Sequence, residues 1–169
     1  SSAASDVYKR QFVSFASLSE DAKNRTILVN GVSKSYAMTG WRIGYSASNP
    51  ALAKVMANYL SHSTSAPSTI SQHAAITALT GPQEDMQVMK EAFEKRRDHL
   101  VERMNRIEGV SCIKPEGAFY LFPRTLEADD RAFCERAKKY DLLLVPGSDF
   151  GAPGHVRISY CCLLYTSDA

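Results

Sequence analysis

The most informative stretch of the sequence is Asn30-Gly31-Val32-Ser33-Lys34-Ser35-Tyr36-Ala37-Met38-Thr39-Gly40-Trp41-Arg42-Ile43-Gly44-Tyr45. It places Lys34 in an apolar, turn-rich setting, eight positions before Arg42. A lysine flanked by serine, tyrosine, alanine and methionine is a candidate for desolvation, which disfavours the ammonium form and frees an amine that can attack a carbonyl. A guanidinium keeps its charge when buried and matches phosphate oxygens through paired N–H groups. We therefore predict a Schiff-base lysine beside an anion site.

This stretch resembles the cofactor-lysine signature of the class I and II aminotransferases, enzymes of fold type I that use pyridoxal 5'-phosphate (PLP). The match, Ser-Lys-x-Tyr-Ala-Met-x-Gly-Trp-Arg-Ile-Gly, is close to the form of the bacterial aspartate-type members, and the resemblance covers roughly residues 12–161. It implies that Lys34 forms the Schiff base with the cofactor and later moves a proton between the substrate's α-carbon and the cofactor's C4′ atom. It also implies that Arg42 holds the cofactor phosphate.

One position departs from the family pattern. Family members often carry a hydroxyl residue three positions before the cofactor lysine, where it helps to bind phosphate, but that position here is Gly31. Ser33 is the candidate substitute from a neighbouring position, and the backbone N–H groups of the glycine turn are the alternative.

A second candidate site lies in the segment His155-Val156-Arg157-Ile158-Ser159-Tyr160, where polar and apolar residues alternate. Alternation is typical of a strand and places Arg157 on the same face as His155 and Ser159. The pattern alone leaves open a solvated arginine or an anion clamp. The family carries an arginine in a similar late strand, where it grips the substrate's α-carboxylate, so the resemblance makes Arg157 the substrate-binding candidate.

Helix and strand signals alternate along the rest of the chain. The longest periodic segment, 82–107, carries an apolar stripe typical of an amphipathic helix that packs on a core: Met86, Met89, Phe93, Leu100, Met104 and Ile107. Further helices are expected at 50–62, 69–79 and 131–140, and strands at 26–29, 41–47, 110–114, 118–122, 142–145 and 155–160. Phe119 and Tyr120 either line the substrate pocket or pack in the core.

These elements predict an α/β chain: the C-terminal piece of a large PLP-binding domain (12–95) and a small α+β-type C-terminal domain (96–161), joined by the long helix. The cofactor lysine lies past the midpoint of the family's chains but at position 34 here, so the sequence resembles the C-terminal part of such an enzyme. The ends, 1–11 and 162–169, resemble translated vector sequence and are expected to be non-native.

Composition excludes several other classes of protein. The net charge of +2 is too small to indicate nucleic acid or an anionic membrane as a partner, and no apolar run approaches the about 20 residues of a membrane helix. A cytoplasmic location is the default expectation. The cysteines at 112, 134, 161 and 162 and the histidines show no metal-ligand spacing, so we predict no metal site and reduced, buried cysteines.

The activity that the resemblance implies is transfer of an amino group between an amino acid and a 2-oxo acid, in an enzyme that is a homodimer. Two alternatives remain open. A PLP-dependent lyase or synthase can use the same scaffold with a similar lysine and arginine. The chain by itself can also be a catalytically inactive partial domain, at most a subunit-interaction module.

Overall fold

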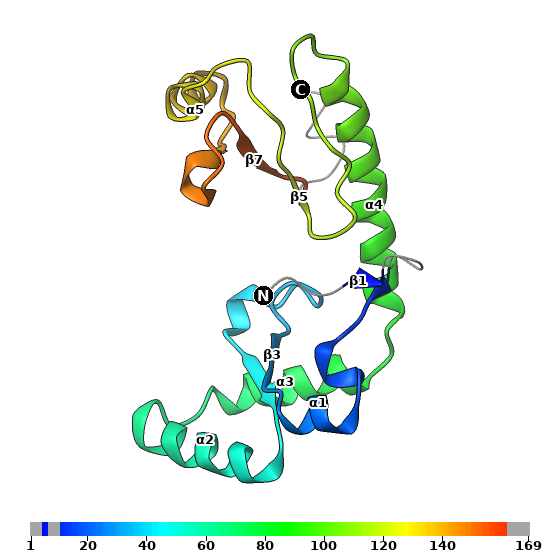
Figure 1. Ribbon diagram of the computed structural model, residues 1–169, viewed down its shortest axis with the longest axis vertical. Coiled ribbons are helices and arrows are strands. Elements are labelled where there is room, and N and C mark those ends of the chain that lie inside the picture. The colour runs from blue at the N-terminus through cyan, green and yellow to red at the C-terminus, as the bar shows by residue number, and fades with distance from the viewer. Residues whose placement is uncertain (1–4, 7–10, 162–169) are drawn as a thin grey trace. The chain divides into compact units, whose positions relative to one another are not determined.

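The computed structural model describes residues 5–6 and 11–161. The chain forms two compact units, Ser1–Met86 and Gln87–Ala169, which we call the first and second units (Figure 1). The long helix α4, Glu84–Asn105, begins at the end of the first unit and continues in the second. Each unit has a hydrophobic core of its own.

The first unit contains short helices and two antiparallel strand pairs. Its elements are β1 (Ser5–Asp6), β2 (Gln11–Phe12), η1 (Phe15–Ser17), α1 (Glu20–Asn24), β3 (Leu28–Gly31), η2 (Thr39–Trp41), β4 (Gly44–Ala47), α2 (Pro50–Ser63) and α3 (Thr69–Thr80). Strand β1 pairs with β2, and β3 pairs with β4. The β3–β4 register runs from Leu28 opposite Ala47 to Gly31 opposite Gly44, so the two strands form a hairpin.

Helices α2 and α3 of this unit follow the sequence closely, whereas α1 was not predicted. The predictions at 50–62 and 69–79 are each confirmed to within one residue. Helix α2 begins there because the Asn49 side chain accepts a hydrogen bond from the Leu52 N–H (3.0 Å), and Pro50 is tolerated in a first turn. The strand predicted at 41–47 is wrong in its first three residues, because Trp41 ends a 3-10 turn and Arg42 has left-handed backbone.

The second unit pairs the long helix with a small sheet. Its remaining elements are β5 (Tyr120–Leu121), α5 (Asp130–Ala137), η3 (Lys138–Tyr140), β6 (Val145–Pro146), η4 (Gly147–Phe150) and β7 (Val156–Ser159). The strand order is β5-β7-β6, and both pairings are antiparallel, so β7 lies in the centre.

The middle part of the apolar stripe of α4 packs in the core of the second unit, as the sequence predicts. Phe93, Leu100 and Met104 lie against a core formed by Cys112, Leu121 and Tyr160. Ile107 lies beyond the helix end and is 48% exposed, so the prediction is wrong at that residue.

The strand predicted at 110–114 is also wrong, because only Ser111 forms a bridge there, with Arg124. The side chain of Asn105 makes hydrogen bonds to the backbone here that a neighbouring strand would otherwise make. It accepts a hydrogen bond from the Cys112 N–H (2.9 Å) and donates one to the Cys112 carbonyl (3.0 Å).

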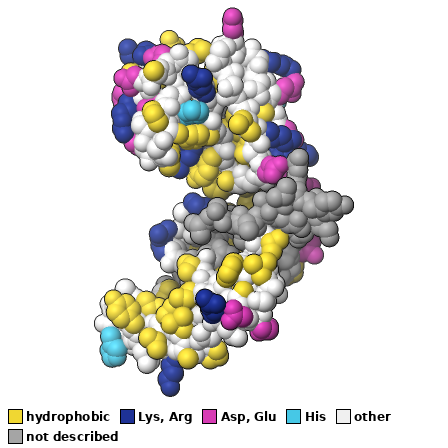
Figure 2. Space-filling view, viewed as in Figure 1, with side chains coloured by type: hydrophobic (Ala, Val, Ile, Leu, Met, Phe, Trp, Pro, Cys, Tyr) yellow, Lys and Arg dark blue, Asp and Glu magenta, His cyan; other side chains and the backbone are white. Residues whose placement is uncertain are grey.

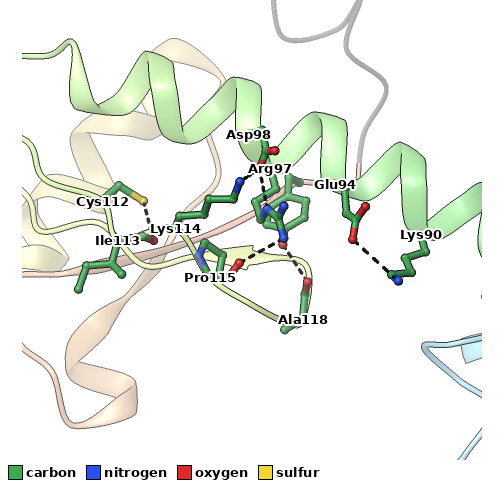
Figure 3. A network of polar contacts seen from close by, with 10 residues as sticks. Lys90, Glu94, Arg97, Asp98, Cys112, Ile113, Lys114, Pro115 and Ala118 are labelled. Carbon is green, nitrogen blue, oxygen red and sulfur yellow. Dashed lines mark hydrogen bonds and ion pairs between the residues drawn. The ribbon is translucent and has the colours of Figure 1, made fainter. Parts of the chain in front are cut away.

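A polar network fixes the chain after α4 to the helix (Figure 3). Asp98 accepts from Arg97 Nε (2.8 Å), and Lys114 Nζ lies 2.8 Å from the same carboxyl oxygen. Bonding by Arg97, and next by Lys114, lowers the pKa of Asp98 to about 2. Arg97 also donates to the Pro115 carbonyl (3.4 Å).

Two of the cysteines are buried as predicted, Cys112 and Cys134, and burial raises the pKa of both thiols. Cys161 is exposed, which corrects the prediction for that residue, and Cys162 lies outside the described residues. Within the described part of the chain, no helix is both long enough and apolar enough to cross a membrane.

Candidate functional site

The loop of the β3–β4 hairpin, residues 32–43, carries Lys34 and Arg42. Its two ends come together at the pair Gly31 and Gly44, where the backbones approach closely: a Cβ on Gly44 would lie 3.2 Å from the Asn30 carbonyl oxygen. Lys34 lies in a turn shortly after the end of β3, in agreement with the turn-rich setting that its sequence predicts.

The apolar side chains of this loop anchor it to α3. Val32 is fully buried and packs in one cluster with Met38 and Ala75. The hydroxyl of Tyr36 donates to Gln83 Oε1 (3.0 Å), and Gln83 Nε2 in turn donates to the carbonyls that end α3, among them Gly81 (2.8 Å). The core of the first unit therefore fixes the loop conformation.

The polar side of the loop is organised around Thr39. Its hydroxyl donates to the Ser33 carbonyl (3.0 Å), and its own carbonyl accepts from Arg42 Nη1 (3.1 Å). Arg42 has φ 52° and ψ 49°, a left-handed conformation that costs a non-glycine residue about 1–2 kcal/mol and persists where the surroundings determine it. The structure thus links Ser33 and Arg42, two of the predicted residues, through Thr39, whose role has no signal in the sequence pattern.

Lys34 does not lie in the apolar setting that its neighbours suggest. The buried residues Val32 and Met38 point into the core, whereas the Lys34 side chain is exposed and Ser33 is half-buried. In a turn, successive side chains point in different directions, so apolar neighbours in the sequence do not desolvate the amine. The Lys34 carbonyl accepts a hydrogen bond from the Ala37 N–H (3.2 Å), which closes the turn.

Arg157 lies on the central strand β7 of the second unit and is half-buried. Its guanidinium carbon is 4.5 Å from the centroid of the Tyr120 ring and 4.6 Å from that of Phe150. Phe150 also meets Phe122 edge to face, and His155 stacks on Phe122 with centroids 5.4 Å apart. One aromatic group therefore contacts both His155 and Arg157, in agreement with the shared strand face predicted for them.

Two adjacent aromatic residues have separate roles. Phe119 packs in the core of the second unit, where its ring stacks on Phe93 at 5.8 Å. Tyr120 contacts Arg157. Of the two roles considered from the sequence, core packing thus describes Phe119, and contact with the candidate site describes Tyr120.

The turn that carries Phe150 is held by a buried carboxylate. Asp130 accepts from the hydroxyl of Ser148, from the Ser148 N–H (2.8 Å) and from the Gly154 N–H (3.2 Å). The hydroxyl bond is the largest cause of a lowered Asp130 pKa. In the sequence, Asp129 and Asp130 are typical of a helix N-terminus. Asp129 has that role, because its side chain accepts a hydrogen bond from the Ala132 N–H (3.0 Å). The sequence does not indicate that Asp130 holds the turn.

The comparisons with known proteins agree with the motif. The family model for aminotransferase class I and II matches residues 3–165. The aspartate aminotransferase of Geobacillus stearothermophilus is 47% identical over 160 residues, which cover 90% of this chain and 41% of that protein. The aspartate aminotransferase of Bacillus subtilis is 46% identical over 166 residues, or 92% of this chain and 42% of that protein.

Solved structures give the same result. The crystal structure of the aspartate aminotransferase from Rhizobium meliloti matches with a TM-score of 0.83 at 43% identity, over 92% of this chain and 42% of that one. The chain thus spans about two-fifths of the length of its curated relatives. With a family model that matches nearly all of its residues, the chain belongs to the class I and II aminotransferases.

Proposed function

We propose that this chain carries part of a PLP-dependent enzyme that transfers an amino group between an amino acid and a 2-oxo acid. The observation that carries the proposal is the loop 32–43, which holds the Lys34–Arg42 motif in a fixed conformation on the core of the first unit. The relatives from Geobacillus stearothermophilus and Bacillus subtilis are named aspartate aminotransferases, which supports the same reaction class.

The residues of the loop suit PLP. An exposed amine at Lys34 can condense with an aldehyde, and Arg42 uses Nη1 for Thr39 while its remaining N–H groups can bind a phosphate. Ser33 is the candidate for an additional phosphate contact. When bound, PLP supplies an electron sink at the substrate's α-carbon.

The steps assigned to this chain are binding, orientation and proton movement. Lys34 Nζ holds the cofactor and then carries the proton removed from the α-carbon. Arg42 would keep the cofactor phosphate in place, which orients the cofactor. Arg157, in the second unit, is the candidate that would bind the substrate's α-carboxylate.

The alternative of an inactive partial domain is supported by the exposure of Lys34 and of apolar side chains in the first unit. Val29, Tyr59 and Ile70 are each more than 70% exposed, and Figure 2 shows hydrophobic side chains on the surface over α2. Apolar surface of this kind is typical of faces that are covered in a larger assembly. The amine is desolvated only if such a cover extends over the loop. The lyase or synthase alternative stays open.

The test is trapping with borohydride after addition of stoichiometric PLP, followed by mass mapping of the labelled lysine. We expect selective labelling at Lys34 and little at Lys54, an exposed lysine in α2 of the same unit. Labelling distributed over many lysines would contradict the proposal for this chain. The alternative, that the chain is an inactive partial domain, would then be favoured.

A matched pair of aldehydes isolates the role of Arg42. Arg42→Ala should reduce labelling of Lys34 by PLP but leave labelling by pyridoxal, which lacks the phosphate, unchanged. Equal losses with both aldehydes would indicate a damaged loop rather than a lost phosphate contact.

Other features of the whole enzyme remain predictions. They are the homodimer, the cytoplasmic location, and the extents 12–95 and 96–161 for the large and small domains. The non-native origin of the ends 1–11 and 162–169 is also a prediction, and most residues of these two ends lie outside the described residues.

A further inference from the structure

The guanidinium of Arg157 is contacted by rings that come from two different neighbours of its strand. Tyr120 lies on β5, opposite Ser159, which makes it the diagonal neighbour of Arg157 on the same face. Phe150 lies in η4, which directly follows β6, the strand on the other side of β7. The rings therefore reach the side chain of Arg157 from the two flanks of the central strand.

Both rings lie within cation–π distance of the guanidinium of Arg157. Aromatic rings attract a cation through their faces, and a guanidinium stacks on them in the same way. Its N–H donors point outward in its own plane. Within residues 5–6 and 11–161, no carboxylate or carbonyl accepts a hydrogen bond from Arg157, so the N–H edge has no acceptor in the described part of the chain.

We propose that Tyr120 and Phe150 are positioning residues, which hold the guanidinium of Arg157 through cation–π contacts and leave its N–H groups for the carboxylate of a ligand. The inference rests on the proposed function, because it takes Arg157 as the carboxylate-binding residue. It adds that the affinity for that carboxylate depends on two aromatic residues through their contacts with Arg157.

The physical gain is pre-organisation. A flexible arginine loses rotamer freedom when a planar carboxylate binds it through two N–H groups, and that loss weakens binding. Rings that already restrict the side chain remove much of this loss. Phe150 is itself held in place, because Asp130 binds the backbone of Ser148 and Gly154 on either side of it.

The test uses the full 169-residue chain and two independent NMR measurements. The first is the rotation of the Arg157 guanidinium in the free protein, where we expect slow rotation with distinct Nη signals. The second is the dissociation constant for pyruvate, a 2-oxo acid with one carboxylate, followed at the Arg157 signals.

Phe150→Leu keeps an apolar side chain but removes the aromatic face. We expect averaged Nη signals and a dissociation constant raised about tenfold, the order of effect expected from one partly buried cation–π contact. Phe150→Tyr restores the ring and should restore both measurements. Tyr140→Leu, an exposed aromatic residue of the same unit, is the matched control and should change neither.

The outcomes separate this inference from the proposed function. If the parent chain binds pyruvate and Arg157→Lys abolishes binding, but Phe150→Leu and Tyr120→Leu leave both measurements unchanged, the positioning role is wrong and the role of Arg157 stands. If pyruvate does not perturb Arg157 in the parent chain, while its rotation is slow and is released by Phe150→Leu, the carboxylate role of Arg157 is wrong, and this inference fails with it.

Discussion

Replacing Val32 by alanine tests whether the buried side of the loop fixes its functional side. Val32 is fully buried and packs with Met38 and Ala75. The substitution removes the equivalent of two buried methylene groups, worth about 0.8 kcal/mol each, and leaves a small cavity. We therefore expect the free energy of unfolding of the first unit to fall by about 2 kcal/mol. Selective trapping of PLP at Lys34 should fall as well, because the loop loses its anchor.

Urea denaturation followed by tryptophan fluorescence measures this effect directly. Trp41 is the single tryptophan of the sequence and lies in the same loop, so its signal reports the structure around Lys34. Val29→Ala is the matched control, because it removes the same atoms from the adjacent strand at a side chain that is 78% exposed. Its effect should stay within about 0.5 kcal/mol. Equal shifts for the two variants would refute the argument that burial of Val32 holds the loop.

Two further predictions concern carboxylates of the second unit. The pKa of Asp98 is lowered to about 2 in the folded chain, below the value of about 3.9 for a free aspartate, so its contribution to stability is present above about pH 4 and is lost as the pH falls towards 2. Thermal unfolding of the parent and of Asp98→Asn should therefore differ at neutral pH and converge near pH 2; a constant difference would contradict the pairing with Arg97 and Lys114. Asp130→Ala should free the Ser148 and Gly154 amides, which hydrogen exchange would detect as faster exchange at these two residues than in the parent chain. Unchanged exchange would show that the turn holds without the carboxylate.

Helices α2, α3 and α4 could be predicted from the sequence because their signals are local. Helix α2 begins where Asn49 and Pro50 predict a cap and a first turn, and α3 ends just before Gly81. The stripe on α4 predicts its buried face because an apolar period of 3.6 residues requires a core to cover it. These features depend on neighbours within a few positions along the chain.

The loop and the short strands depend on distant neighbours, and the sequence predicts them less well. The apolar residues around Lys34 suggested a desolvated amine, but Val32 and Met38 turn toward Ala75 of α3 while Lys34 remains exposed. Likewise, Thr39 shows its role only once its hydrogen bonds to Ser33 and Arg42 are known. Propensity cannot indicate such contacts, since they arise when the hairpin closes on α3.

The alternation at 155–160 correctly predicts the face of Arg157, but not the rings that meet it. Tyr120 precedes Arg157 by 37 positions, and its contact with the arginine follows from the antiparallel register of β5 on β7. Phe150 approaches because η4 follows the other neighbouring strand. A period-2 pattern identifies a face but carries no information about which strands lie beside it.

The two arginines that we assign to anions are held in ways that leave their charge available. A carboxylate partner would orient an arginine equally well, but it would also compete with the incoming anion and reduce the local potential. Arg42 is instead held by the carbonyl of Thr39, and Arg157 by the rings of Tyr120 and Phe150. Neutral dipoles and aromatic faces restrict a guanidinium without neutralising it. Among the described residues, a cation that is positioned without a carboxylate partner is thus provided by a left-handed turn in one unit and by an aromatic pair in the other.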